Sequence, residues 1–223
     1  MSIPYLPYKI NEYDIIKNTN HITLLPRKTT NEHQNRFKLL SNNLKLELKQ
    51  KYPNNFIKVS IYNEDCWILY PLQQEAHKRL KGTGLSPEII DEGIAYKFKV
   101  YVDIGLNENW VDKYYILYLV MEKLGQSLDK IYIPVEERDE YIGPGFEIHS
   151  DIINDFKFKL YEEREFQLMF PEKYFTKNLV DDIKNIIIKL SKLGIILLDV
   201  HTGNFLKYNE TILAIDFECV KII

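Results

Sequence analysis

Residues 192–218, near the end of the chain, read KLGIILLDVHTGNFLKYNETILAIDFE and carry the clearest pattern in the sequence. Apolar runs flank a polar loop that carries Asp199 and Asn204. Asp216 directly follows a further apolar run, ILAI, which is typical of a buried strand. A carboxylate at the end of such a strand needs a partner, because desolvating a lone charge is costly. The pattern therefore predicts one site that contains Asp199, Asn204 and Asp216.

These three side chains suit phosphoryl transfer. That reaction uses oxygen ligands on magnesium, and a carboxylate aimed at the attacking hydroxyl. The amide oxygen of Asn204 is a hard ligand of the kind magnesium prefers. Two simpler interpretations stay open. Asp199 and Asn204 could form a turn in which both side chains bond local backbone, and Asp216 taken alone could be a surface turn carboxylate.

The motif Asp-x-x-x-x-Asn, after a long helix and a short apolar strand, resembles the catalytic loop of the protein-kinase-like superfamily. Asp-Phe-Glu at 216–218 resembles the metal-binding segment of that family. Both are more similar to choline and aminoglycoside kinases and to small bacterial effector kinases than to typical eukaryotic kinases. The resemblance implies that Asp199 is the catalytic aspartate, that Asn204 and Asp216 hold Mg²⁺, and that ATP is the phosphate donor.

The resemblance extends upstream as an ordered series over roughly residues 56–218. Lys58 in FIKVSIY is similar to the strand lysine that holds the nucleotide phosphates, and Glu75 in PLQQEAHKRL is similar to its helix partner. LVMEKL resembles the hinge between the lobes, which puts Met121 and Glu122 near the adenine. On the residues alone, Lys58 is equally a solvent-facing strand lysine, and Glu75 is equally part of a charged helix face.

The chain departs from the family pattern in several places. Leu197 stands where a histidine usually precedes the aspartate, and no glycine occurs before Gly82 to form a phosphate-covering loop. Residues 20–55 are expected to cover the phosphates instead, through the cations and hydroxyls of Arg27, Lys28, Thr29 and Thr30. His201 lies at a variable position of the family and is expected to be a solvated loop histidine.

The end of the chain is expected to be a contact surface. Nothing follows Ile223 that could form the helical platform on which kinases dock their acceptors. The final stretch is too apolar to end comfortably in water, because it contains Phe205, Phe217, Val220, Ile222 and Ile223. A second copy of the chain, or a host or regulatory protein, is therefore expected to bind there.

Bulk properties exclude several classes of protein. Lys and Arg total 29 and Asp and Glu total 32, so the net charge is −3 and a dedicated nucleic-acid binder is disfavoured. The two cysteines, Cys66 and Cys219, are too few for a disulfide framework or a cysteine zinc site. Neither a signal peptide nor a membrane-spanning run is expected from the residues. The expected location is cytoplasmic, with the interior of a host cell as one form of it.

The chain changes character near Glu122, from strand-rich to mainly helical. Strands are expected at 21–25, 56–62, 66–70, 96–104 and 114–122, and helices at 31–51, from Pro71 to about Leu80, and from Thr176 or Asn178 to Leu193. Three parts follow: an N-terminal extension and atypical lobe start at 1–55, a kinase-like N-lobe at 56–122, and a truncated C-lobe at 123–223.

These observations predict an α+β, two-lobed, protein-kinase-like fold with a truncated helical C-lobe. The predicted function is ATP- and Mg²⁺-dependent phosphoryl transfer to a hydroxyl, by an atypical minimal Ser/Thr protein kinase. Two alternatives remain. One is a pseudokinase that serves as a binding or regulatory module, which the missing glycines favour. The other is a small-molecule kinase of the choline or aminoglycoside type.

Overall fold

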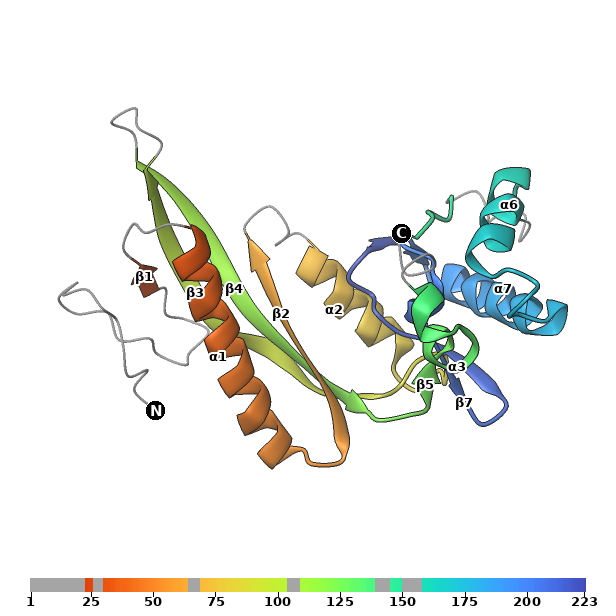
Figure 1. Cartoon of the computed structure of the whole chain (residues 1–223), viewed down its shortest axis with the longest axis horizontal. Coiled ribbons are helices and arrows are strands. Elements are labelled where there is room, and N and C mark those ends of the chain that lie inside the picture. The colour runs from red at the N-terminus through yellow and green to blue at the C-terminus, as the bar shows by residue number, and fades with distance from the viewer. Residues whose placement is uncertain (1–22, 26–29, 64–68, 104–108, 139–144, 150–157) are drawn as a thin grey trace. The chain divides into compact units, whose positions relative to one another are not determined.

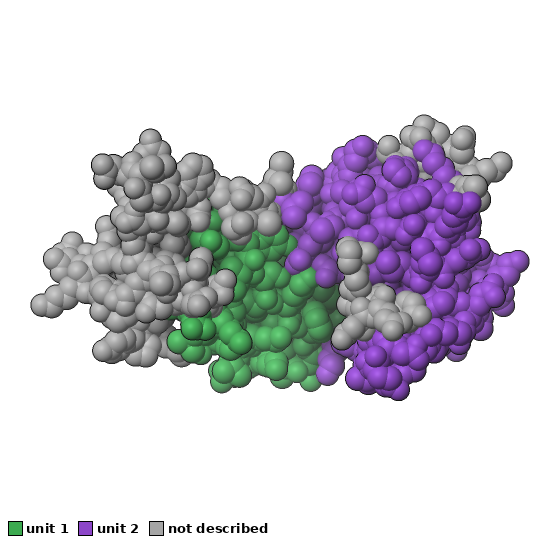
Figure 2. All heavy atoms as spheres, turned by 45° about the horizontal axis from the view of Figure 1, so that its top comes forward, with its two compact units in different colours: residues 1–68, 89–122 green, residues 69–88, 123–223 purple. Residues whose placement is uncertain are grey.

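The computed structural model describes residues 23–25, 30–63, 69–103, 109–138, 145–149 and 158–223. The fold is α+β, and the chain divides into two compact units, coloured separately in Figure 2. The first unit is Met1–Ile68 with Ile89–Glu122, and the second is Leu69–Glu88 with Lys123–Ile223. One division falls after Glu122, where the sequence changes character. Residues 69–88, however, group with the second unit, whereas the sequence placed them in the N-lobe.

The first unit is built on a four-stranded sheet with the order β1-β3-β4-β2. Its strands are β1 (Thr23–Leu25), β2 (Asn55–Asn63), β3 (Ile89–Asp103) and β4 (Asn109–Glu122). β3 pairs with β4 in antiparallel orientation, and β1 joins β3 in parallel. β3 begins at Ile89 rather than at Tyr96. Register shifts near Ile89 and Ile94 break the apolar alternation there, which hid this part of the strand from sequence analysis.

Helix α1 (Thr30–Lys51) covers one face of this sheet (Figure 1). The helix predicted at 31–51 is thus confirmed. Its buried side chains recur at helical spacing and pack against the strands; they are Phe37, Leu40, Leu44 and Leu48. Each such burial stabilises the fold by about 1.5–3 kcal/mol.

The second unit contains four α-helices in its described residues: α2 (Leu69–Leu80), α3 (Leu128–Tyr132), α6 (Leu160–Met169) and α7 (Lys177–Lys192). Five short strands form two small antiparallel sheets, β5-β7-β8 and β6-β9. The strands are β5 (Gln126–Ser127), β6 (Ile195–Leu197), β7 (Phe205–Tyr208), β8 (Thr211–Ala214) and β9 (Val220–Ile222). Two 3-10 turns, η1 (Val135–Glu137) and η2 (Thr202–Asn204), complete the unit.

The strand predicted at 66–70 is wrong at its described end. Leu69 and Tyr70 open helix α2, and Pro71 lies in its first turn, where proline is tolerated. Tyr70, Gln73, Ala76 and Leu80 are buried at helical spacing. A short apolar run such as CWILY does not distinguish strand from helix by itself, and here the helical pattern of the following residues prevails.

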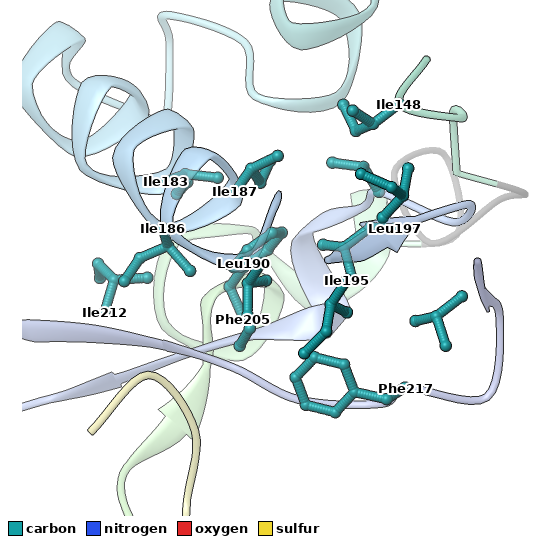
Figure 3. Close-up of a cluster of buried hydrophobic side chains, with 14 of the residues drawn as sticks. Ile148, Ile183, Ile186, Ile187, Leu190, Ile195, Leu197, Phe205, Ile212 and Phe217 are labelled. Carbon is teal, nitrogen blue, oxygen red and sulfur yellow. The ribbon is translucent and has the colours of Figure 1, made fainter. Parts of the chain in front are cut away.

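Helix α7 is the centre of the second core. Thr176 caps it by accepting a hydrogen bond from the Leu179 backbone, 3.4 Å long, and Gly194 ends it with a φ of 73°. Figure 3 shows its apolar stripe facing the strands that follow. The stripe comprises Ile183, Ile186, Ile187 and Leu190, and it packs against residues that include Ile195, Phe205, Ile212 and Phe217.

The apolar end of the chain belongs to this same core. Phe205, Phe217 and Val220 are at most 2% exposed, and Ile222 packs against the cluster from its edge. β9 also pairs with β6, so the backbone of the final stretch is hydrogen-bonded. The sequence-based reason for expecting a partner at this surface is therefore wrong for these side chains, and Ile223 alone of the five is exposed.

No helix among the described residues has the length and apolarity needed to cross a bilayer.

Candidate functional site

Asp199, Asn204 and Asp216 all belong to the second unit. Asp199 follows β6, Asn204 ends η2, and Asp216 follows β8. The Asn204 side-chain Nδ2 donates to the Asp199 carbonyl at 2.9 Å, and the Ile215 backbone N–H donates to the Asn204 carbonyl at 2.9 Å. Asp216 is the next residue. Two hydrogen bonds thus link Asn204 to Asp199 and to the residue that precedes Asp216.

Asp216 has a left-handed backbone conformation, with a φ of 62°. This region is uncommon for residues other than glycine, although Asp and Asn enter it more readily than most. The conformation is held by the next residue, since Phe217 is 2% exposed and its ring meets the His77 ring of α2 edge-on at 5.9 Å. Residues kept in such regions cluster at functional sites, because packing must maintain them.

The Asp199 carboxylate is approached from two sides. Its Oδ1 accepts a hydrogen bond from the Gly145 backbone N–H at 2.7 Å, and its Oδ2 lies 3.5 Å from His201 Nε2. The hydrogen bond with His201 and the one from Gly145 lower the pKa of Asp199, while partial burial opposes them. A carboxylate with a lowered pKa is ionised at neutral pH and is a weak base. It is better suited to orient a hydroxyl than to remove its proton.

His201 is held in place, in contrast to the solvated loop histidine that the sequence predicted. Its side chain is 14% exposed, and its Nδ1 accepts a hydrogen bond from the Gly203 backbone N–H at 3.1 Å. A neutral imidazole whose Nδ1 accepts carries its proton on Nε2, the nitrogen that faces Asp199. A side chain that accepts from the backbone N–H two residues further on is a common local motif. The spacing of His201 and Gly203 was therefore the sequence signal from which an ordered His201 could have been predicted.

The segment 145–149 runs beside the Asp199 loop and was not predicted to be part of the site. Phe146 and Val200 exchange backbone hydrogen bonds of 3.2 and 2.9 Å, and the Ile148 N–H donates to the Leu197 carbonyl at 3.0 Å. Both Phe146 and Ile148 are buried. Sequence analysis did not identify a role for this segment, because pairing between distant parts of a chain leaves no local pattern.

The oxygen atoms at this site fit magnesium. The Asn204 side chain, 6% exposed, donates from its Nδ2 to the Asp199 carbonyl, so Oδ1 is the atom of this side chain with the chemistry of a magnesium ligand. Asp216 adds a carboxylate, and both are hard ligands. Within the described part of the chain, no group of three or more His, Cys, Asp or Glu side chains is arranged to hold a metal ion.

Lys58 lies on the face of the first unit's sheet that is turned away from α1. It pairs with Leu119 of β4, and Leu119 pairs with Glu92 of β3, so these three side chains share one face. Their neighbours Ile57 and Val120 point to the opposite face and pack with α1. Glu92 was not predicted as a site residue, because strand register is not visible in one sequence.

Glu75 is engaged within its own helix. Its carboxylate lies 3.1 Å from Arg79 Nε and 3.8 Å from Lys78 Nζ. Glu75 belongs to the second unit and Lys58 to the first. Their pairing therefore stays a prediction, and the helix-face interpretation of Glu75 gains support.

Met121 and Glu122 end strand β4. Met121 is buried, and its carbonyl accepts a hydrogen bond from Asn55 Nδ2 at 3.4 Å, while Glu122 is partly buried. Their proximity to an adenine stays a prediction. Of the stretch expected to cover the phosphates, residues 30–51 form α1, and Arg27, Lys28 and Thr29 lie outside the described residues.

The chain matches no protein-family model and no curated protein.

Proposed function

We propose that this protein is an ATP- and Mg²⁺-dependent phosphotransferase with a kinase-like fold, acting on a hydroxyl. The observation that carries the proposal is the link between the Asp199 loop and the turn that begins at Asp216. The Asn204 side chain donates to the Asp199 carbonyl, and the Asn204 carbonyl accepts from Ile215, the residue before Asp216. Residues predicted from two separate motifs thus lie in adjoining loops, and Asp216 has a left-handed backbone conformation.

The arrangement of elements supports the same proposal. A strand, a polar loop, a hairpin and a final strand follow one another as β6, the Asp199 loop, β7-β8 and β9. β6 pairs with β9 and β7 pairs with β8, which places both carboxylates next to the hairpin. The first unit is a sheet with one covering helix, α1, whereas the helix that the resemblance implies for the N-lobe, α2, belongs to the second unit.

In the proposed reaction, the residues of this chain bind the metal and the nucleotide and orient the acceptor hydroxyl. Asn204 and Asp216 would hold Mg²⁺, which when bound neutralises charge on the nucleotide phosphates. Asp199 would orient the acceptor hydroxyl. The hydroxyl oxygen forms a bond to the γ-phosphorus of ATP, the bond from that phosphorus to ADP breaks, and the hydroxyl proton leaves toward Asp199 or water. Lys58 would contact the phosphates, and Met121 and Glu122 would border the adenine.

A thermal-shift assay tests nucleotide binding. ATP with Mg²⁺ should stabilise the protein clearly more than either alone, by about 2.7 kcal/mol at a hundredfold excess over the dissociation constant. Asp216→Asn should abolish this response, because it removes the charge yet tolerates the left-handed backbone. Asp216→Ala is a poorer test, since its strain would destabilise the fold by itself. An unchanged response in Asp216→Asn would contradict the metal assignment.

Labelled ATP separates an enzyme from a pseudokinase. With Mg²⁺, the wild-type chain should transfer label to itself or to a generic protein acceptor such as casein. Binding without any transfer would favour the pseudokinase, which the absence of glycine before Gly82 makes the second candidate. Transfer to aminoglycosides or choline, but to no protein, would favour the small-molecule kinase.

A further inference from the structure

The Asp199 carboxylate lies between two hydrogen-bond donors from different parts of the chain. One is the Gly145 backbone N–H, 2.7 Å from Oδ1, and the other is His201 Nε2, 3.5 Å from Oδ2. Each donor is itself fixed by neighbouring structure. A carboxylate with both oxygens engaged has little freedom to rotate.

Gly145 is fixed by the segment that follows it. Phe146 is bridged to Val200, next to Asp199, and the His149 backbone N–H donates to Glu162 Oε1 at 2.9 Å. Glu162 is fully buried, and its Oε2 accepts from the Lys159 N–H at 2.7 Å, so α6 anchors this segment. A side chain at position 145 would not fit, because a Cβ there would lie 2.5 Å from Asp199 Oδ1 and 2.6 Å from the Val200 nitrogen.

His201 is fixed by the turn it caps. The Gly203 N–H occupies Nδ1 at 3.1 Å, and a Cβ on Gly203 would lie 2.9 Å from the imidazole ring. The ring is therefore held against η2 with its Nε2–H turned to Asp199. The distance of 3.5 Å is long for a hydrogen bond, and a small closure would shorten it.

We propose that His201 and Gly145 are positioning residues that set the orientation of the Asp199 carboxylate toward the acceptor hydroxyl. This inference rests on the proposed function. Transfer rates depend steeply on such orientation, and a misplacement of about 1 Å can cost about a hundredfold in rate. The segment 145–149 then belongs to the active site through its contact with Asp199, and not through contacts with the metal or the nucleotide.

Two substitutions separate positioning from local structure. His201→Asn keeps a short acceptor for the Gly203 N–H but has no donor that reaches Asp199. His201→Gln places an amide donor at about the reach of Nε2. If His201 positions Asp199, His201→Asn should lower kcat about 10- to 100-fold with the KM for Mg-ATP unchanged, and His201→Gln should recover most of that loss.

The measurements are steady-state transfer of label from ATP with Mg²⁺ to casein or to the chain itself, and the melting temperature of each variant. A wild-type kcat in His201→Asn would overturn the inference, as would losses of kcat that simply follow losses of melting temperature. Gly145→Ala gives the second arm. It should lower kcat more than it lowers the affinity for Mg-ATP, and equal losses of both would count against Gly145.

The position of His201 against Asp199 can also be tested without measuring turnover. A wrong positioning role can therefore be told apart from a wrong proposed function. In ¹⁵N-labelled protein, the neutral His201 ring should show the Nε2-protonated tautomer, and the Nδ1-protonated tautomer would overturn the inference. If the tautomer is as expected but the wild type transfers no phosphate, the proposed function fails. If the wild type transfers phosphate but the other tautomer is found, the positioning role fails alone.

Discussion

Asp199 should be needed for transfer and dispensable for nucleotide binding. Asp199→Asn removes the charge that orients the hydroxyl but keeps an oxygen that can accept from the Gly145 N–H. ATP affinity and melting temperature should stay near wild type, while phosphotransfer falls by about two orders of magnitude or more. Calorimetry and labelled ATP measure the two effects. Activity at the wild-type level would remove Asp199 from the reaction.

Asp91 should make the stability of the first unit depend on pH. Its carboxylate accepts hydrogen bonds from Tyr52 Oη at 2.6 Å and Tyr118 Oη at 3.3 Å, with Lys51 Nζ at 3.4 Å. Burial raises the pKa of Asp91, but the hydrogen bonds from Tyr52 and Lys51 outweigh it, and the net shift is downward from 3.8. A lowered folded-state pKa gives stability that is present above 3.8 and is lost as the pH falls through the folded value.

Asp91→Asn should therefore cost about 1 kcal/mol of unfolding free energy at pH 7 and progressively less below pH 4. Urea unfolding from pH 2.5 to 7 measures this. Tyr52→Phe serves as the matched control, since it removes the shortest of the three contacts and should flatten the same pH dependence. A difference between wild type and Asp91→Asn that stays constant with pH would contradict the interpretation.

Asp199 and His201 also show which site residues can be identified from the sequence alone. The polar loop was identified because its residues are neighbours in the chain, and Asp216 because it follows an apolar run. Gly145 was missed because its contact with Asp199 joins residues 54 positions apart. His201 was seen but misjudged, since capping of Gly203 depends on a rotamer that composition does not reveal.

At the scale of elements, the register of the first unit's sheet predicts which carboxylate supports Lys58. Lys58 and Glu92 flank Leu119 on one face, with Cα atoms about 10 Å apart, a span that two extended side chains can bridge. Lys58→Met and Glu92→Gln should each weaken Mg-ATP binding about tenfold, which is about 1.4 kcal/mol. Glu75→Gln should have no effect, because Arg79 and Lys78 already engage that carboxylate.

The double variant is the control for this prediction. Lys58→Met with Glu92→Gln should bind nucleotide no more weakly than Lys58→Met alone, because the two residues act as a pair. Additive losses would show that Glu92 acts independently. Weakening by Glu75→Gln, with Glu92→Gln at the wild-type level, would restore the helix partner that the resemblance implies.

Arg79 should be the main tie between α2 and the end of the chain. Its Nη1 donates to the Leu193 carbonyl and to the Ile223 carbonyl, each at 2.9 Å, and its Nε donates to Glu75. Arg79→Ala should lower the unfolding free energy by about 1.5–3 kcal/mol, the range for hydrogen bonds to charged groups. Lys78→Ala, at an exposed neighbour, should change it by less than about 0.5 kcal/mol. Equal effects of the two would contradict this role.

For the whole molecule, the α+β class and most elements could be predicted, because α1, α7 and the strands β2 and β4 follow from local apolar spacing. The assignment of α2 to the second unit could not be predicted. Its buried residues fit a helix on either unit, and only the contacts of its side chains, such as His77 with Phe217, decide between them. The beginning of β3 was missed because its register shifts interrupt the alternation of apolar residues.

The prediction that a partner binds the end of the chain rested on five apolar side chains, most of which the structure buries. Since Phe205, Phe217 and Val220 fill the protein's own core, the exposed apolar surface at the end of the chain is reduced to Ile223. The prediction that a second copy or a regulatory protein binds the chain is tested by light scattering and activity measurements across a concentration series. Specific activity that rises with concentration is the expected result, and a monomer whose specific activity is independent of concentration would contradict the prediction.

The backbone of Asp216 has a consequence for how this sequence can evolve. With φ at 62°, glycine would relieve a steric cost of about 1 kcal/mol there while deleting the carboxylate. Selection for heat resistance alone should therefore enrich glycine at position 216, and selection for phosphoryl transfer should oppose it. In a population of related genes, aspartate at this position would mark the lineages still under selection for chemistry, and glycine would mark those released from it.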